Sequence, residues 1–329
     1  MSINTEFNKF INNNLALSQK DISNAVSSRE WLITKIVDKI AEKTDCPQLY
    51  SENGSKYIQF GSYFKGTKVS DVDEFDILLI VDTTNGMFLK EETKKGDGIG
   101  NTNPNPLYFE KYYKDGTTYV SSRKLLTWLK DIIDEVLEPY GCEPSEKDGQ
   151  AVTAYIKSKD LHIDFVPGCI FQKVNTTDSE GIFYIIPKGD IDCGWIETNP
   201  RIDKKILGDI SANYTQFKNT IRLFKYLFKS SYYVTIGSYA VESALVDYES
   251  SNVFYDDFKY DFIGALNHII ELVDNGKIPD MRDNNINLLG DINKDATLDK
   301  LKRIKSKFEM LDEESSTFSD DVEALLKNE

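Results

Sequence analysis

The sequence has no long hydrophobic run and no start that resembles a leader. No apolar stretch in its 329 residues approaches the roughly 20 residues that span a bilayer. The first ten residues, MSINTEFNKF, lack the basic and then apolar layout of a signal peptide. We therefore expect a cytoplasmic protein without a membrane partner.

Cysteine and histidine are scarce. The four cysteines lie far apart with no C-x-x-C pair, and only two histidines accompany them. This spacing argues against both a disulfide framework and a structural zinc site. We expect buried free thiols at Cys46, Cys142, Cys169 and Cys193.

Positive charge is also in short supply. The chain carries 39 Lys and Arg against 54 Asp and Glu, which gives a net charge of −15. An acidic chain repels nucleic acid over most of its surface, so only a small local basic site is compatible with this composition. The hydrophobic content of 40% suffices for a core, and the length fits one large bilobal unit or two domains.

Hydrophobic periodicity divides the chain into an α+β half and a helical half. Five segments predict strands: KYIQFGS, FDILLIV, GQAVTAYIKS, DLHIDFVPG and GIFYIIPKG. Helices are predicted over residues 21–43, 121–138, 213–229, 237–249, 255–273 and 298–311. Residues 83–106, rich in Gly, Asn, Lys and Pro, are typical of a surface insertion. These patterns predict two domains, residues 1–200 and residues 201–329.

Acidic residues stand at the start of the apolar strand FDILLIV. Residues two apart in a strand point to the same face, so Glu74 and Asp76 project together, roughly 6.5–7 Å apart along the chain. Asp164, in the strand pattern LHIDFV, joins them if the two strands are neighbours. Three converging carboxylates suit hard cations such as Mg²⁺. A purely structural alternative is that Glu74 and Asp76 end a loop and that Asp164 pairs with a lysine.

A glycine-serine pair precedes these acids. Gly61-Ser62 follows a predicted strand, and Lys65, Gly66 and Thr67 come shortly after it. A glycine permits close backbone approach to a ligand, and a serine hydroxyl with nearby amides can hold phosphate oxygens. The pair alone is a weak signal, but its combination with an acid-x-acid pair and a third strand acid is specific.

The segment GSYFKGTKVSDVDEFDILLIV resembles the nucleotidyltransferase signature of the polymerase-beta superfamily. Its EFD is most similar to cGAS and Mab21-type proteins, and its GSYFKGT to the bacterial cGAS/DncV-like synthases. The resemblance continues through GWIETNP, NTIRLFKYLFK and GSYAVESALV, and so covers most of residues 55–250. It implies a sheet lobe and a helical lobe around a central cleft, with Glu74, Asp76 and Asp164 as the catalytic metal-binding triad.

The same resemblance implies the nucleotide contacts. Gly61 and Ser62 match the triphosphate turn, and Gln59 in the preceding strand joins them as a nucleotide-binding candidate. A lysine at the position of Lys225 reaches the donor triphosphate in this family, and a pair like Ser238-Tyr239 supplies phosphate contact and base stacking. The residues themselves leave alternatives open: Tyr239 as a core tyrosine, and a solvated basic face in place of the stripe formed by Lys218, Arg222, Lys225 and Lys229.

The implied activity is two-metal nucleotidyl transfer. The resemblance implies a cyclic di- or trinucleotide second messenger made from NTPs, with ATP among them and two Mg²⁺ ions for which Mn²⁺ substitutes. The implied setting is bacterial anti-phage signalling, in which the product activates a separate effector. The alternatives are a linear 2′-5′ oligoadenylate synthetase, an invertebrate cGAS-like receptor, or a non-catalytic Mab21-like binding protein. Since the His/Cys zinc insert of animal cGAS is missing, we expect no activation by duplex DNA.

Overall fold

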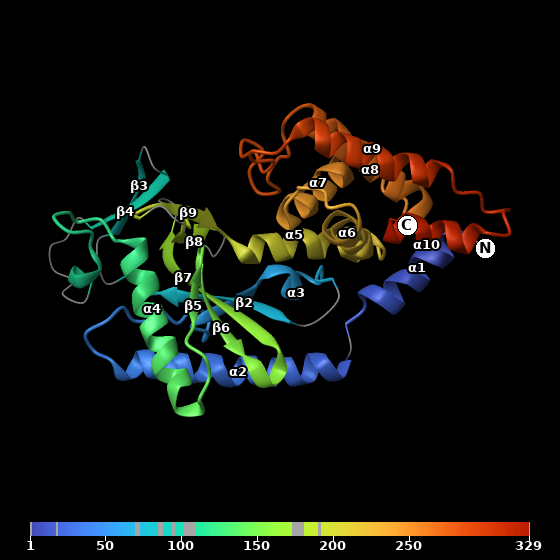
Figure 1. Ribbon diagram of the computed structural model, residues 1–329. Coiled ribbons are helices and arrows are strands. Elements are labelled where there is room, and N and C mark those ends of the chain that lie inside the picture. Colours follow the sequence, from blue (N-terminus) through green and yellow to red (C-terminus); the bar gives the residue numbers. More distant parts are fainter. Residues whose placement is uncertain are drawn as a thin grey trace. The chain divides into compact units, whose positions relative to one another are not determined.

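The computed structural model describes residues 2–17, 19–69, 73–84, 88–93, 96–101, 109–172, 181–189 and 192–328 (Figure 1). Its contacts divide the chain into two compact units. The sheet unit consists of Gln19–Tyr63 and Val72–Pro200, and the helical unit consists of Met1–Ser18, Phe64–Asp71 and Arg201–Glu329. The α+β class predicted from the sequence is confirmed.

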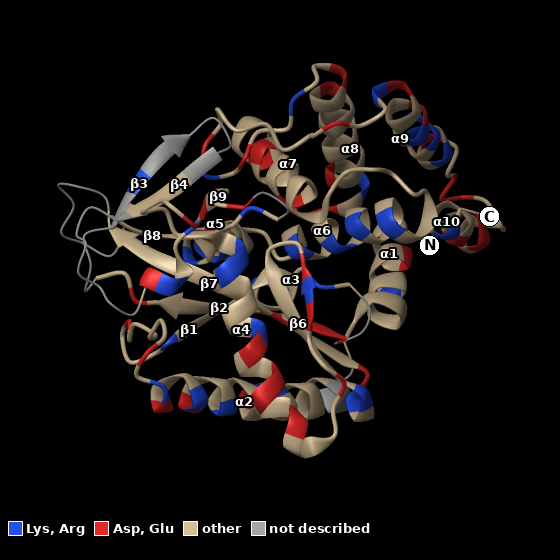
Figure 2. Ribbon diagram, turned by 60° about the vertical axis from the view of Figure 1, so that its left-hand side comes forward, with Lys and Arg blue, Asp and Glu red and all other residues tan. Residues whose placement is uncertain are grey.

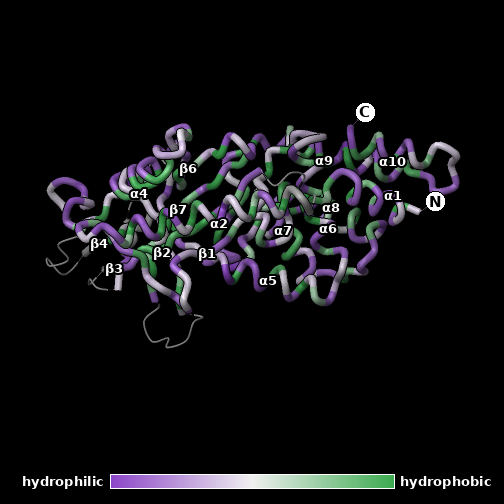
Figure 3. Tube along the Cα trace, turned by 90° about the horizontal axis from the view of Figure 1, so that it is seen from below, coloured by the Kyte–Doolittle hydropathy of each residue, from purple (hydrophilic) through white to green (hydrophobic). Residues whose placement is uncertain are grey.

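One mixed sheet organises the sheet unit, in the order β1-β2-β7-β8-β9-β4-β3, with β6 pairing to β7 and β5 to β6. The strands are β1 (Tyr57–Phe60), β2 (Glu74–Val81), β3 (Phe88–Thr93), β4 (Gly96–Asn101), β5 (Glu146–Asp148), β6 (Ala151–Ile156), β7 (Leu161–Gln172), β8 (Ile182–Pro187) and β9 (Trp195–Thr198). Strands β2 and β7 are parallel, which places a crossover between them. From Ile77 onward β2 is buried, as expected for an apolar strand at the centre of a sheet (Figure 3).

Helices α2 (Gln19–Glu42) and α4 (Ser122–Leu137) pack against each other in the sheet unit. Their predicted bounds were close, because both carry a clear apolar stripe, and the Ser121 hydroxyl caps α4 by accepting from the Lys124 amide at 3.2 Å. Charged residues of both signs alternate over α2 (Figure 2). Short 3-10 turns complete this unit at η2 (Glu110–Tyr112), η3 (Glu138–Tyr140) and η4 (Lys157–Lys159).

The predicted insertion at 83–106 is partly wrong. Strands β3 and β4 form an antiparallel hairpin within it, and β4 meets β9 through Asp97 and Trp195. The sequence missed this hairpin because its glycines and lysines break the alternation of apolar residues that marks a strand. Residues 85–87, 94–95 and 102–108 of this segment lie outside the described part of the chain.

The helical unit is built around clustered phenylalanines. Its helices are α1 (Ile3–Phe10), α5 (Pro200–Asn213), α6 (Phe217–Tyr226), α7 (Ser238–Ser251), α8 (Phe258–Asp274), α9 (Lys294–Glu309) and α10 (Phe318–Lys327), with π-helical turns at η1 (Ile11–Leu15) and η6 (Leu227–Ser231). The Phe7 ring lies 5.4 Å from Phe262 and 6.2 Å from Phe308, and Phe224 stacks on Phe262 at 4.9 Å. The first residues of the chain, which the sequence assigned to the catalytic lobe, therefore lie in the helical unit.

The four cysteines, all expected to be buried, differ in their burial. All four cysteines are free, but only Cys46 and Cys169 are buried, whereas Cys142 and Cys193 are half-buried and lie outside the helices and strands. Among the described residues, every helix is too short or too polar to cross a membrane.

Candidate functional site

Three carboxylates converge at the start of two neighbouring strands of the sheet unit. Glu74 and Asp76 come from β2 and Asp164 comes from β7. The parallel register sets Asp76 beside Asp164, and each of the three residues offers an oxygen within 4.8 Å of the other two. The strand periodicity and the pairing of the two strands thus bring together the acids that the sequence singled out.

The site holds these acids in different surroundings. Glu74 is exposed, whereas Asp76 and Asp164 are half-buried. Burial raises the pKa of Asp164, and the negative charge of Glu74 raises it further, while the Thr153 hydroxyl donates a 2.6 Å hydrogen bond that opposes both effects. A divalent cation would favour the ionised form that burial and repulsion disfavour, so the cluster has the electrostatics of a cation site.

Gly61 forms the wall of this cluster. It begins α3 (Gly61–Lys65) with φ of 74°, directly after Phe60, which pairs with Asp76 in the antiparallel β1–β2 ladder. A Cβ atom at this position would lie 1.7 Å from Asp76 Oδ2 and 2.4 Å from its Cγ. Only glycine fits, because the backbone lies directly against the carboxylate and adopts a left-handed conformation. Ser62 follows as the second residue of α3.

Arg29 of α2 and Tyr63 of α3 pack against Phe75, which lies between the two strand acids. Phe75, between the two strand acids, points to the opposite face and is fully buried. The Arg29 guanidinium lies 4.6 Å from the centre of its ring, and the Tyr63 ring packs edge-on against it at 4.8 Å. The sequence missed Arg29, whose only signal is an arginine within an otherwise regular amphipathic helix.

The side-chain amide of Gln59, which the sequence proposed as a nucleotide contact, is hydrogen-bonded to Glu30 of α2. Its Nε2 donates to Glu30 Oε1 at 3.0 Å, and the Tyr57 hydroxyl donates to Glu30 Oε2 at the same distance. The structure therefore places Gln59 in a polar link between β1 and α2.

Lys225 is buried within the helical unit, in a cluster that we call the Glu242 cluster: Lys65, Thr67, Lys225 and Glu242. The Lys225 ammonium donates to Glu242 Oε1 and lies 3.1 Å from Thr67 Oγ1 and 3.5 Å from the Thr67 carbonyl. Lys65 donates to the other oxygen of Glu242, and the Thr67 hydroxyl donates to Oε1 at 2.6 Å. Burial would raise the pKa of Glu242, but the two ammonium groups outweigh it and hold that pKa low.

The other members of the predicted basic stripe have different environments. Lys218 and Arg222 are half-buried on α6, and Lys229 is exposed after α6 has ended. The stripe is therefore not a uniform solvated face. Burial lowers the pKa of Lys218, Arg222 and Lys225 alike.

Ser238 and Tyr239 begin α7. Ser238 is exposed in the first turn of the helix, after Gly237 at the N-cap. The Tyr239 hydroxyl donates to Asp280 at 3.2 Å or to Asp203 at 3.3 Å, while Lys65 Nζ and Arg282 Cζ lie 5.1 Å and 5.7 Å from the ring centre. Burial raises the pKa of Tyr239. Its hydroxyl is thus anchored, and cations contact its ring.

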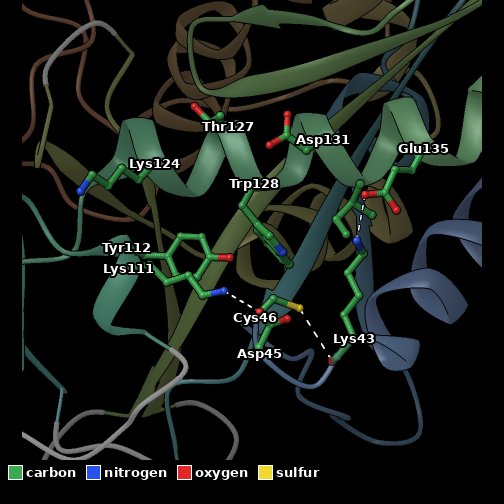
Figure 4. A pocket seen from close by; sticks show the side chains of 11 residues that line it. Lys43, Asp45, Cys46, Lys111, Tyr112, Lys124, Thr127, Trp128, Asp131 and Glu135 are labelled. Atoms are coloured by element: carbon green, nitrogen blue, oxygen red, sulfur yellow. Dashed lines mark hydrogen bonds and ion pairs between the residues drawn. The ribbon is translucent and has the colours of Figure 1, made fainter.

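A separate pocket of about 440 Å³ lies between α4, η2 and the residues that follow α2 (Figure 4). Lysine–carboxylate ion pairs line it, at Lys111–Asp45 (2.6 Å) and Lys43–Glu135 (2.8 Å), together with Trp128. It contains none of the site residues predicted from the sequence.

Comparison with known proteins agrees with this geometry. Residues 63–180 match the Mab-21 protein nucleotidyltransferase domain, a segment that contains all three acids. A probable cyclic nucleotide synthase of Bacillus cereus (strain VD146) is 24% identical over 267 residues, which cover 81% of this chain and 77% of the relative. The CdnC:HORMA-deltaN complex of E. coli MS115-1 contains a similar fold, with a TM-score of 0.68 and 13% identity over 98% of this chain and 96% of that chain. The resemblance predicted from the sequence is confirmed.

Proposed function

We propose that this chain is a nucleotidyltransferase that joins nucleoside triphosphates into a cyclic di- or trinucleotide. The observation that carries the proposal is the convergence of Glu74, Asp76 and Asp164 beside the Gly61 turn. The relative described as a probable cyclic nucleotide synthase supports the cyclic product.

The three carboxylates fit magnesium. The ligand atoms are all oxygens, and hard divalent cations prefer such ligands together with substrate phosphates. Glu74 and Asp76 would hold one ion and share a second with Asp164. Bound there, the ions would neutralise triphosphate charge and lower the pKa of the acceptor hydroxyl. Mn²⁺, which accepts the same ligands, would substitute.

The residues of the chain position the reactants. Gly61 lets the Asp76 carboxylate lie directly against the backbone. The Ser62 hydroxyl and the neighbouring backbone amides would hold phosphate oxygens next to the acids. The acceptor ribose hydroxyl loses its proton to solvent, and its oxygen forms a bond to the α-phosphorus. The bond from the α-phosphorus to the bridging oxygen breaks, and pyrophosphate leaves with that oxygen. A second transfer closes the ring. Within the helical unit, taken by itself, Ser238 at the exposed start of α7 is a candidate phosphate contact, and Tyr239 is a candidate for stacking against a base.

The biological setting that we propose is bacterial anti-phage signalling. A small cyclic product diffuses to a separate effector protein, so the enzyme itself needs no membrane or nucleic-acid surface. The net charge of −15 agrees with this arrangement, because it disfavours polyanionic partners.

The test is to incubate the pure protein with all four NTPs and Mg²⁺ and to identify products by mass spectrometry. We expect a cyclic product, which Asp76→Asn and Asp164→Asn abolish while circular dichroism stays unchanged. Asp115→Asn, at an exposed acid of the same unit, is the matched control and should retain activity. A linear 2′-5′ product would refute ring closure, and nucleotide binding without any product would indicate a binding protein.

A further inference from the structure

The Lys225 ammonium group donates its hydrogen bonds to other residues of the helical unit. An ammonium group has three N–H donors, and the Lys225 ammonium has three oxygens around it: Glu242 Oε1, Thr67 Oγ1 and the Thr67 carbonyl. Its side chain is only 6% exposed. A phosphate could reach this nitrogen only by displacing Glu242 or Thr67, so Lys225 serves to fix the segment around Thr67 to α6 and α7.

Two other cations of α6 are differently placed. Lys218 and Arg222 are separated by one helical turn, a spacing that puts their Cβ atoms about 5–6 Å apart. Among the described residues, no carboxylate lies within ion-pair distance of either side chain. Arg222 donates through Nη1 to Asn219 at 3.1 Å, but its Nε is buried without a hydrogen-bond partner in the part of the chain described here.

The surroundings make this pair costly without an anion. Burial lowers the pKa of both side chains, and the charges of Arg222 and of Lys204 on α5 add to the effect on Lys218. A buried donor without a hydrogen-bond partner is unfavourable, and a bound ion is one way in which native proteins satisfy such a group. Basic residues therefore lie together on α6 (blue in Figure 2), with no ion-pair partner among the residues that the structure describes.

Gly66 lies against the Lys218 side chain. Its φ is 74°, and a Cβ atom there would lie 3.4 Å from Lys218 Cδ and 3.6 Å from its Nζ. The Lys218 side chain thus lies close to the backbone of residues 65–67, while Lys225 holds the next residue, Thr67. Both sides of this small basic site are fixed by the fold.

We propose that Lys218 and Arg222, with Lys204 at the edge, bind the polyphosphate chain of a nucleoside triphosphate, and that Lys225 is a positioning residue. This inference rests on the proposed function, whose substrates carry such a chain. A guanidinium offers several donors in a planar fork that matches phosphate oxygens, and a neighbouring ammonium adds a point charge. A long polyanion fits less well, because the chain carries an excess of 15 negative charges.

The experiment is isothermal titration of the full chain with inorganic tripolyphosphate, ATP, inorganic phosphate and a short DNA duplex. We expect tripolyphosphate and ATP to bind, and Lys218→Ala and Arg222→Gln each to weaken both by roughly tenfold to a hundredfold. Lys229→Ala, an exposed lysine just beyond α6, is the matched control and should bind as the wild type does. Lys225→Ala should lower the melting temperature but leave tripolyphosphate affinity of the folded protein within about threefold, since no donor of Lys225 is assigned to the ligand.

Four results would overturn the inference. Wild-type affinity for tripolyphosphate in both Lys218→Ala and Arg222→Gln would do so, as would a selective loss of that affinity in Lys225→Ala. Inorganic phosphate binding as tightly as ATP would indicate a free-phosphate site instead. Tighter, Lys218-dependent binding of a short DNA duplex would indicate a nucleic-acid surface. Because binding is measured without turnover, a wild type that binds tripolyphosphate through Lys218 but forms no product would refute the proposed function alone.

Discussion

Gly61→Ala should change the geometry of the acid cluster without changing its charge. The new Cβ atom would be placed 1.7 Å from Asp76 Oδ2, 2.4 Å from Cγ and 2.9 Å from Cβ of the same residue. Asp76 has little room to withdraw, because its strand is paired on one side with β1 and on the other with β7. We expect its carboxylate to rotate away from Glu74 and Asp164 rather than the strand to move.

The expected losses of stability and of activity have two separate causes. A non-glycine residue at φ of 74° costs about 1 kcal/mol or somewhat more in folding free energy. Misplacement of a reacting geometry by about 1 Å can cost about 10²-fold in rate. We therefore expect a stability loss of about 1–3 kcal/mol in urea unfolding and a loss of at least about a hundredfold in product formation per folded molecule.

Gly54→Ala supplies the control for backbone strain. Gly54 has φ of 83°, but a Cβ atom there would meet nothing within 4 Å. This variant should lose similar stability and keep its activity. Equal product formation by the Gly61→Ala and Gly54→Ala proteins would refute the assignment of Gly61 as the wall of the site.

Three further predictions concern pH, stability and DNA. Thr153→Val removes the hydrogen bond that lowers the pKa of Asp164, so the pKa of Asp164 should rise further. The acid limb of the pH–activity profile should then move to higher pH. An acid limb that stays in place would show that another group controls it. Glu242→Gln leaves the Lys65 and Lys225 ammonium groups without their carboxylate and should destabilise the protein by about 3–5 kcal/mol at pH 7. Because the folded pKa of Glu242 is depressed, its contribution is lost as the pH falls below the ordinary value of 4.5, so wild type and variant should converge in acid; a pH-independent difference would contradict this. Long duplex DNA at low salt should leave product formation unchanged, and a salt-sensitive, several-fold stimulation would point to an animal-type sensor.

The acid cluster could be predicted from the sequence because it depends on local rules. The period of two in a strand orients Glu74 and Asp76, and the apolar runs around Asp76 and Asp164 mark both strands as central. Neighbouring central strands then bring the three acids together. The glycine after the first strand was expected to allow close backbone approach, but its φ of 74° and its contact with Asp76 could not be predicted from the sequence.

The environment of Lys225 could not be predicted in the same way. Its partner Glu242 lies on another helix, and the pattern of α6 alone is compatible with a stripe of equivalent cations. The buried position of Lys225 depends on α7 and on the segment around Thr67, which are remote in sequence. Helix α1, by contrast, was predictable and was missed: Ser2 caps it, and Ile3, Phe7 and Phe10 follow a helical period.

The acid cluster of the sheet unit and the basic pair of the helical unit each bring together charges of one sign, negative in the first and positive in the second. In the sheet unit, three carboxylates within 4.8 Å of one another repel, and burial raises the pKa of Asp164. In the helical unit, Lys218 and Arg222 lie half-buried with no carboxylate of the described residues beside them. A nucleoside triphosphate bound to divalent ions carries both kinds of charge, with cations for the acids and phosphate oxygens for the bases. The same ligand class therefore accounts for each site independently, whatever the placement of the two units, and a neutral ligand would account for neither.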